Sequence, residues 1–187
     1  MAERLFIVRH GETEWSRSGQ HTSHTDLPLT EAGRRAAAAL APRLEAQGFE
    51  LVLCSPLRRA RQTCELAGFS DVAEPCRDLV EWDYGRYEGL TTPQIRELDP
   101  DWNLWRDGCP EGESPADIGA RVDRVLDRFT TIDGLGLCFA HGHVLRVLTA
   151  RWLEMEVSGG ARFKLPAAGV GVLGHERETS VLESWSA

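Results

Sequence analysis

The sequence is poor in cysteine and lacks any cysteine spacing that indicates a structural framework. Its 187 residues include five cysteines, an odd number, and none of them forms a C-x-x-C pair. A disulfide-stapled fold or a cysteine-rich zinc site is therefore not expected, and we predict reduced thiols. Cys54 and Cys138 lie inside short apolar runs, where a free thiol serves as a small hydrophobic side chain.

Long apolar stretches and an excess of positive charge are also missing. The N-terminus leads into a strand-like run without the apolar segment of a signal peptide, and no uninterrupted apolar run approaches membrane-spanning length. The formal net charge is −8, which argues against nucleic acid or an anionic membrane as a partner. We therefore expect a cytoplasmic protein that binds a small molecule, since a local basic pocket can sit in an acidic surface.

The chain shows neither an internal repeat nor a linker-like stretch. With 42% hydrophobic and 27% charged residues, it has the composition of a soluble globular protein. A chain of this length buries about 70% of the surface that it exposes when unfolded. One domain over residues 1–187 is therefore predicted.

Short apolar runs alternate with helical patterns. The runs predict buried strands at residues 5–8, 51–54, near 72–73 and 137–140. Helices are predicted from Thr30 to Gly48, from Pro56 to about Leu66, after Ser114-Pro115, and after His141 to about Leu153. This alternation is typical of an α/β fold with helices on both faces of a doubly wound, mostly parallel sheet. Residues 170–173 and 181–185 predict a hairpin at the sheet edge, through which a homodimer could form.

Two stretches have no regular period. Residues 15–29 are rich in Ser, Thr, Gly and His and predict an ordered loop. An insertion is predicted at about 82–113, with a short helix near Thr92–Leu98, packed as a lid over the ligand crevice. Five aromatic residues gather there: Trp82, Tyr84, Tyr87, Trp102 and Trp105. A partner interface is the alternative explanation for these aromatics.

Reactive side chains follow three of the predicted strands. The first strand ends in Arg9 and His10, the strand at 137–140 ends in His141, and the run at 51–54 leads to Arg59. In an open α/β sheet, ligands bind beyond the carboxyl ends of the strands, so these side chains are expected to share a pocket. A neutral imidazole is a nucleophile near pH 7, and arginine forms paired hydrogen bonds to phosphate.

Phosphoryl transfer needs an in-line nucleophile, positive donors for the non-bridging oxygens and a proton for the leaving alkoxide. His10 is the predicted nucleophile. The predicted donors are Arg9, Arg59 and His141. Glu81 is the predicted general acid, because the apolar side chains of Leu79, Val80 and Trp82 flank it and such surroundings can raise the pKa of a carboxyl group. The alternative is an exposed surface glutamate.

Four ordered motifs resemble those of the histidine phosphatase superfamily, also called phosphoglycerate-mutase-like. They are residues 9–13 (RHGET), 55–63 (SPLRRARQT), 81–85 (EWDYG) and 140–143 (AHGH), and the match spans nearly the whole chain. The resemblance implies a three-layer α/β fold and no cofactor. It also implies that His10 becomes phosphorylated, that Glu81 donates a proton, and that three residues form the phosphate pocket: Arg9, Arg59 and His141.

Residues 15–22, 25–30, 105–109 and 168–173 resemble the acid phosphatase and sugar-bisphosphatase branch, which includes fungal sedoheptulose bisphosphatase-like proteins. The likeness implies substrate contacts from Ser16, Thr22, Ser23, Tyr84, His143 and Arg146. Mutases carry asparagine where Ser16 stands and glycine where Ser23 stands, and two residues follow the last predicted strand where mutases have a longer tail. The expected activity is metal-independent hydrolysis of small phosphate monoesters, such as sugar phosphates or bisphosphates.

Three alternatives stay open at this point. A phosphoglycerate mutase would use the same phosphohistidine. A metal-dependent hydrolase could use His141-x-His143 or His21-x-x-His24, although no carboxylate stands at H-E-x-x-H spacing. A non-catalytic phospholigand-binding module would keep the pocket and lack the chemistry, although all five expected reactive groups are present.

Overall fold

A single mixed sheet of six strands forms the centre of the computed structural model, which describes residues 2–186. The strands are β1 (Arg4–Arg9), β2 (Leu51–Cys54), β3 (Glu74–Pro75), β4 (Leu135–Ala140), β5 (Val170–Glu176) and β6 (Thr179–Trp185). Their order is β3-β2-β4-β1-β5-β6; the first four run parallel, and β5 and β6 add an antiparallel hairpin. The predicted parallel sheet with an edge hairpin is confirmed.

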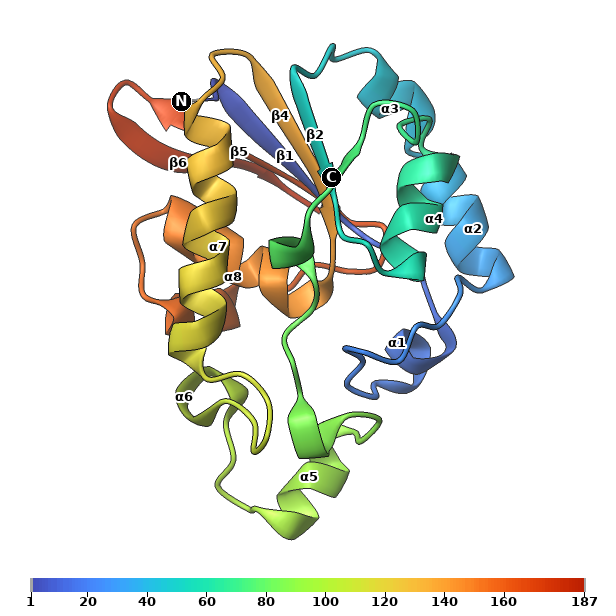
Figure 1. Ribbon diagram of the computed structural model, residues 1–187, viewed down its shortest axis with the longest axis vertical. Helices are drawn as coiled ribbons and strands as arrows, with labels where there is room; N and C mark the ends of the chain where they lie inside the picture. The colour runs from blue at the N-terminus through green and yellow to red at the C-terminus, as the bar shows by residue number, and fades with distance from the viewer. Residues whose placement is uncertain (1, 187) are drawn as a thin grey trace.

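Strand β1 shows why helices cover both faces of this sheet. Successive side chains of a strand point to opposite faces, so Leu5 and Ile7 belong to one hydrophobic cluster and Phe6 and Val8 to another. Helices α7 (Pro115–Thr130) and α8 (Gly142–Trp152) contribute to the first cluster. Helices α2 (Glu31–Ala38), α3 (Ala41–Glu45) and α4 (Arg58–Leu66) cover the other face (Figure 1). The three-layer α/β fold is confirmed.

The helix predicted from Thr30 to Gly48 is two helices. Helix α2 ends at Ala38, and α3 begins at Ala41 with Pro42 in its first turn. Proline has no N–H to donate to the carbonyl four residues earlier, here Ala38, and its ring clashes with that carbonyl, which favours the break seen between α2 and α3. The prediction was right about the helical pattern and wrong about its continuity.

Two other helix boundaries differ from the prediction. The stretch at 15–29 was expected to be a loop throughout, but it opens with α1 (Glu14–Ser18). Thr13 and Ser16 cap this helix reciprocally, each side chain bonding the other's backbone N–H. Helix α4 begins at Arg58 rather than Pro56, which lies in the turn before it. The weak third strand lies two residues later than expected, at Glu74–Pro75.

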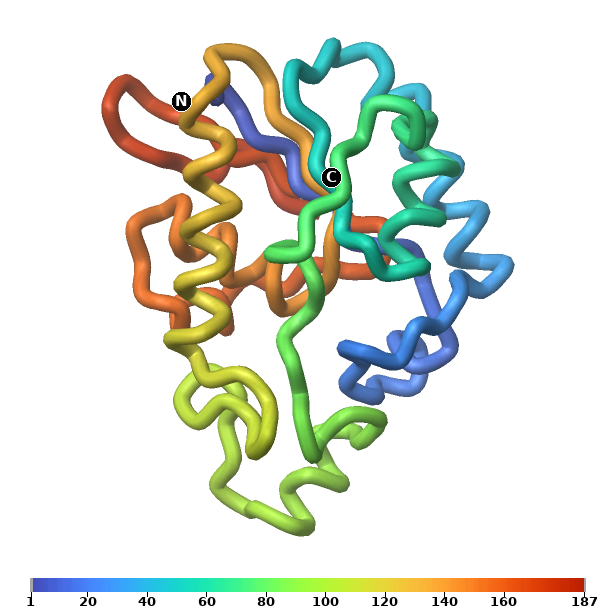
Figure 2. Tube along the Cα trace, viewed as in Figure 1, coloured from blue at the N-terminus to red at the C-terminus, as the bar shows by residue number. Residues whose placement is uncertain are grey.

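Residues 82–113 extend beyond the carboxyl ends of the parallel strands. They lie at the same end of the molecule as α1 (Figures 1 and 2). The predicted helix is α5 (Thr92–Leu98), and a second short helix, α6 (Leu104–Asp107), was not expected. Four of the aromatics are buried in the cluster on the α7 and α8 face: Trp82, Tyr84, Tyr87 and Trp102. Their rings therefore anchor the stretch to the main core.

Three short 3-10 helices complete the described elements, at Arg77–Leu79, Gly85–Tyr87 and Val157–Arg162. The five cysteines are free and buried. None of the helices within residues 2–186 is long and apolar enough to cross a membrane.

Candidate active site

Three parallel strands deliver side chains to one edge of the sheet. β1 is followed by His10, β4 by His141 and β2 by Ser55. A pocket of about 230 Å³ opens beside them. Its lining includes eight of the predicted site residues, namely Arg9, His10, Ser16, Thr22, Glu81, Tyr84, His143 and Arg146.

The His10 ring is oriented by backbone groups. Its main-chain N–H donates to Ala140 O (2.9 Å), which ties it to β4, and its Nδ1 lies 2.7 Å from Gly11 O. A carbonyl only accepts, so Nδ1 carries the hydrogen and Nε2 keeps a free lone pair. Burial, followed by the charges of Arg9 and Arg59, holds the pKa of His10 well below its usual range. The ring is therefore neutral, and Nε2 is its unprotonated nitrogen.

Gly11 allows the backbone to pass close to a neighbouring helix. A Cβ at this position would lie 2.5 Å from Gly33 O of α2, a distance that no side chain tolerates. The N–H of Gly11 donates to Thr63 Oγ1 of α4 (2.9 Å). The Arg-His-Gly turn is thus fixed between two helices and holds the imidazole in place.

Arg9 presents an unsatisfied donor beside His10. Its Nη1 donates to Leu165 O (2.6 Å), whereas its Nε is buried without a partner. The guanidinium lies close to Gly142, where an added Cβ would be 3.3 Å from the arginine Cζ. Burial lowers the pKa of Arg9, and a buried donor without an acceptor is costly. An anion next to His10 would remove that cost.

Glu81 lies at the N-terminus of α8. Its carboxylate accepts N–H bonds from Trp82 (2.9 Å), His143 (3.0 Å) and Val144 (2.9 Å). The sequence predicted apolar surroundings for this group, and Trp82 is indeed fully buried. The carboxyl oxygens themselves, however, accept hydrogen bonds from three backbone N–H groups. Two of these N–H groups belong to the first turn of α8, which begins soon after the end of β4.

Arg59 and His141 lie behind the pocket rather than in its lining. Arg59 is fully buried, and its guanidinium donates to the carbonyls of Thr22 (3.0 Å), Ser23 (3.2 Å) and Thr25 (3.2 Å). Its Nε donates to His141 Nδ1 (3.1 Å). These bonds shape the loop at 22–25 and leave Arg59 little capacity for a ligand, so its direct phosphate contact stays a prediction.

His141 is neutral and has a defined tautomer. Burial and the neighbouring Arg59 hold its pKa well below the usual range. Because Nδ1 accepts from Arg59, Nε2 carries the hydrogen and donates to Ser55 Oγ (2.7 Å). The rings of His141 and His10 are 5.2 Å apart. Arg59 and Ser55 thus hold the His141 ring beside the His10 ring, and its contact with phosphate stays a prediction.

The far side of the pocket is a cluster of rings. Tyr84 Oη lies 2.6 Å from His143 Nδ1. Burial raises the pKa of Tyr84 and lowers that of His143, so the phenol donates and the imidazole presents Nε2–H. The Arg146 guanidinium lies 4.6 Å from the centre of the Trp105 ring. Tyr84, His143 and Arg146 thus form a side of the pocket that presents N–H donors and aromatic surface to a leaving group.

The hydroxyl residues near the pocket are less available than predicted. Ser16 Oγ is used in the cap of α1, and Thr22 Oγ1 donates to Gln20 O (3.1 Å). Ser23 is buried outside the lining, and the Glu88 carboxylate binds its N–H (2.8 Å). Ser16 and Thr22 do reach the pocket wall, whereas the Ser23 hydroxyl donates to the main-chain Glu81 O (3.5 Å) behind it.

The sequence offers His21 either as a metal ligand or as part of a polar loop at the pocket mouth, and the structure supports the second: the centre of its ring lies 4.7 Å from that of Tyr84, and the residue lines the pocket. Two further residues at the site were not predicted. Glu88 organises the loop at 22–25 by accepting the N–H groups of Ser23 and Thr25. Lys164 also lines the pocket. Lys164 is the only lysine in the chain, and this rarity is a feature of the sequence that could have drawn attention to it.

The paired histidines do not converge as metal ligands. His141 bonds Ser55 and Arg59, whereas His143 bonds Tyr84. His24 points to Asp83 (3.1 Å) on the surface. Over residues 2–186, no group of three or more His, Cys, Asp or Glu side chains is arranged to hold a metal ion.

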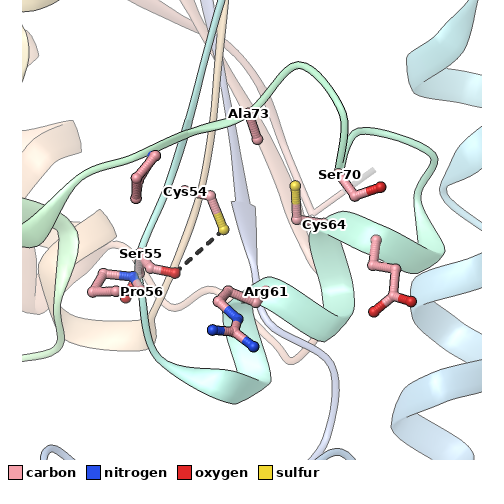
Figure 3. A pocket seen from close by; sticks show the side chains of 9 residues that line it. Cys54, Ser55, Pro56, Arg61, Cys64, Ser70 and Ala73 are labelled. Atoms are coloured by element: carbon pink, nitrogen blue, oxygen red, sulfur yellow. Dashed lines mark hydrogen bonds between the residues drawn. The ribbon is translucent and has the colours of Figure 1, made fainter.

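A second cavity, of about 280 Å³, lies between β2, α4 and β3. Figure 3 shows Cys54 of β2 and Cys64 of α4 facing it, with Arg61 at one side. This cavity and the pocket beside His10 are of similar size, but none of the predicted site residues lines this cavity. The convergence of reactive groups therefore selects the pocket beside His10 as the candidate active site.

Acidification is expected to destabilise the fold through the buried histidines. The pKa values of His10 and His141 are depressed by burial, whereas unfolded histidine titrates near 6.5. Their contribution to stability is thus complete above about pH 6.5 and falls below it by about 1.4 kcal/mol per pH unit for each ring. Burial lowers the pKa of His21 to about 4, so protonation of unfolded His21 adds to the loss of stability between about pH 6.5 and pH 4.

Thermal unfolding followed by circular dichroism between pH 8 and pH 4 tests this expectation. The Tm should change little down to about pH 6.5 and then fall. The variant His21→Gln removes one of these rings and should make the fall shallower. A Tm that rises on acidification from pH 6.5 to pH 5 would contradict the assignment of neutral, buried rings.

Comparison with known proteins supports the predicted resemblance. A family model for the histidine phosphatase superfamily (branch 1) matches residues 5–187. An acid phosphatase of Mycobacterium tuberculosis is 44% identical over 188 residues, covering 96% of this chain and 91% of that protein. The sedoheptulose 1,7-bisphosphatase of Saccharomyces cerevisiae is 37% identical over 190 residues, covering 84% of this chain and 70% of that protein.

A solved structure has the same fold. The product of open reading frame Rv3214 of Mycobacterium tuberculosis matches with a TM-score of 0.92 and 41% identity, covering 100% of this chain and 98% of the other. The family model, the curated relatives and the structural match thus agree with the four motifs. The chain belongs to the histidine phosphatase superfamily, branch 1.

Proposed function

We propose that this protein is a metal-independent phosphatase that hydrolyses small phosphate monoesters through phosphorylated His10. The observation that carries the proposal is the neutral His10 ring with a free Nε2, placed beside the unpartnered Nε of Arg9 and the Glu81 carboxyl group. The names of the relatives, an acid phosphatase and a sedoheptulose 1,7-bisphosphatase, support hydrolysis as the outcome.

The first step transfers the phosphoryl group to the enzyme. His10 Nε2 attacks phosphorus, the phosphorus–oxygen bond of the ester breaks, and protonated Glu81 gives its proton to the departing alkoxide. The Arg9 guanidinium, which lines the pocket beside His10, binds a non-bridging oxygen that gains negative charge in the transition state. The products of this step are a free alcohol and phosphohistidine.

The second step returns the enzyme to its starting state. Water attacks phosphorus, the carboxylate of Glu81 takes a proton from that water, and the nitrogen–phosphorus bond breaks. Inorganic phosphate leaves with His10 neutral and Glu81 protonated. The bond from Gly11 O to Nδ1–H orients the imidazole in both steps and stabilises the positive charge that the ring carries while phosphorylated.

The charge of the pocket supports a substrate with a second anionic group. Arg9, Arg146 and Lys164 line it, and Glu81 is the only acidic residue in the described lining. Among the described residues, none of the three cations forms an ion pair with a carboxylate. This positive pocket sits in a chain of net charge −8. Arg9 suits the transferred phosphoryl group. Arg146 bonds Gly160 O from Nε (2.9 Å) and Ala161 O from Nη2 (2.8 Å), so its Nη1, together with Lys164, suits a second phosphate or a carboxylate.

A panel of phosphate esters tests the proposed activity. Purified protein is incubated with nitrophenyl phosphate, glycerol phosphate, 3-phosphoglycerate and sugar mono- and bisphosphates, with and without EDTA. Phosphate release is expected, and EDTA should leave it unchanged because protein cations neutralise the phosphoryl oxygens. Chelator-sensitive turnover restored by a divalent ion would contradict the proposal, and so would conversion of 3-phosphoglycerate to 2-phosphoglycerate far faster than phosphate release.

Replacing Lys164 by alanine is expected to affect only substrates that carry a second anion. The value of kcat/KM should fall about tenfold for a sugar bisphosphate or for 3-phosphoglycerate, the size expected for one lost charge-assisted bond. Glycerol phosphate should be unaffected, and Lys164→Arg should retain most of the activity. Comparing the loss on the sugar bisphosphate with the loss on 3-phosphoglycerate shows whether the pocket prefers a phosphate or a carboxylate as the second anion. Equal losses on all substrates would contradict this role.

A further inference from the structure

Arg121 is a buried arginine that the mechanism above does not use. It lies on α7, is 6% exposed, and every N–H of its guanidinium has a partner. Nη1 donates to Asp78 O (2.8 Å) and Val80 O (2.7 Å), and Nη2 donates to Glu81 O (3.2 Å). The other two bonds go to the Glu113 carboxylate: Nε to Oε1 (2.6 Å) and Nη2 to Oε2 (2.8 Å). Three of its five bonds therefore fix the backbone that ends in Glu81.

Glu113 holds the same segment from the other side of Glu81. Its Oε2 accepts the Asp83 N–H (2.9 Å), and its main-chain carbonyl accepts Trp82 Nε1–H (3.0 Å). Its own N–H donates to Asp83 O (3.0 Å). Residues 78–83 are thus bonded to Arg121 before Glu81 and to Glu113 after it. The Glu81 side chain is left to point toward the N-terminus of α8.

Stability alone does not account for this arrangement. A buried ion pair recovers only about what its desolvation costs, and apolar replacements of similar volume are often neutral for stability. A general acid, in contrast, must meet the leaving oxygen within hydrogen-bond reach, and a displacement of about 1 Å can cost about 100-fold in rate. The five directed hydrogen bonds of Arg121 are suited to holding the backbone of residues 78–81 in one position.

We infer that Arg121 and Glu113 form a positioning pair that sets the Glu81 carboxyl group for proton transfer to the leaving group. The inference rests on the proposed function, because it assigns the pair to the protonation step of that reaction. Neither residue lines the pocket, so the pair acts through the 78–83 backbone and contacts no substrate. Its effect is therefore confined to reactions in which the leaving group needs a proton.

The test compares two leaving groups in matched variants. Arg121→Met keeps the apolar volume and removes the bonds to the backbone. For glycerol phosphate, an alkyl ester, its kcat/KM should fall about 100-fold, and for nitrophenyl phosphate, whose leaving group needs little help from an acid, it should fall less than about threefold. Glu113→Gln should show the same selectivity more weakly.

Arg124→Met is the matched control. Arg124 lies on the same helix, is exposed, and pairs with the Asp78 carboxylate (2.6 Å). The backbone carbonyl that it bonds, Ala120 O (3.3 Å), belongs to α7 itself and not to residues 78–83. Both substrates should react at wild-type rates in this variant. If Arg124→Met reproduced the selectivity of Arg121→Met, the effect would belong to the helix surface, and the inference would fail.

The double variant Arg121→Met with Glu81→Gln separates positioning from general damage. If Arg121 acts through Glu81, the double variant should be no slower on glycerol phosphate than Glu81→Gln alone. Multiplied losses would overturn the inference, and so would equal losses on both substrates in Arg121→Met. If the methionine variant does not fold, Arg121→Lys provides the same comparison. Its kcat/KM should then show an intermediate loss for glycerol phosphate and none for nitrophenyl phosphate. Failure of wild-type protein to release phosphate from either ester would instead reject the proposed function.

Discussion

His10→Ala is expected to reduce kcat by about 10⁴-fold or more on every phosphate ester, because it removes the group that forms the covalent intermediate. The loss should not depend on the leaving group, since attack on phosphorus is required whatever the alcohol. Steady-state assays with nitrophenyl phosphate and a sugar phosphate measure it. The ring is 5% exposed, so the Tm of the variant must be recorded to exclude loss of folded protein.

His24→Ala serves as the control for this experiment. Its side chain is 73% exposed and pairs with Asp83 outside the pocket, so the variant should keep wild-type activity. A folded His10→Ala protein that retained even a tenth of wild-type kcat would contradict nucleophilic catalysis by this ring.

Glu81→Gln is expected to give the second large effect, and this effect should depend on the leaving group. Loss of the transferable proton should lower kcat/KM by about 10²-fold to 10⁴-fold on alkyl phosphates. Nitrophenyl phosphate should lose far less, because nitrophenolate leaves without protonation. A pH profile should also lose the limb that reports the acid.

The structure adds a second consequence of this substitution. The carboxylate accepts N–H bonds on both oxygens, from Trp82 and Val144 on one and from His143 on the other. An amide group must direct its NH₂ toward one of these donors, so Glu81→Gln loses at least one bond at the N-terminus of α8. Glu81→Ala, measured beside it, shows whether that mismatch contributes. Equal losses on alkyl and nitrophenyl esters in both variants would contradict a role in proton donation.

Features that depend on short stretches of sequence were predictable. The runs before His10, Ser55 and His141 are apolar and end abruptly, so the strands and the shared edge of the sheet follow from local pattern. The cap at Ser114 before α7 follows from its side chain and the proline after it, and the structure shows Ser114 bonded to the Asp117 N–H (3.2 Å).

Features that depend on contacts between distant residues were not predictable. Arg59 follows its strand as expected, yet its guanidinium is occupied by carbonyls of the loop at 22–25. The bonds from Arg121 to residues 78–81 span at least 40 positions, and no periodicity marks such a contact. The break at Pro42 is different, because the proline that interrupts the helix is visible in the sequence; the helix-forming alanines before it nevertheless favour a continuous helix.

Rapid quenching of the wild-type protein during turnover of nitrophenyl phosphate shows whether His10 carries the phosphoryl group on Nε2. We expect an acid-labile phosphoprotein, formed at no more than one phosphate per chain and absent from His10→Ala. Peptide mapping should place the phosphate on Nε2 of His10, since Nδ1 donates to Gly11 O. Turnover without any phosphoprotein, or phosphate mapped to another residue or to Nδ1, would contradict phosphoryl transfer through Nε2 of His10.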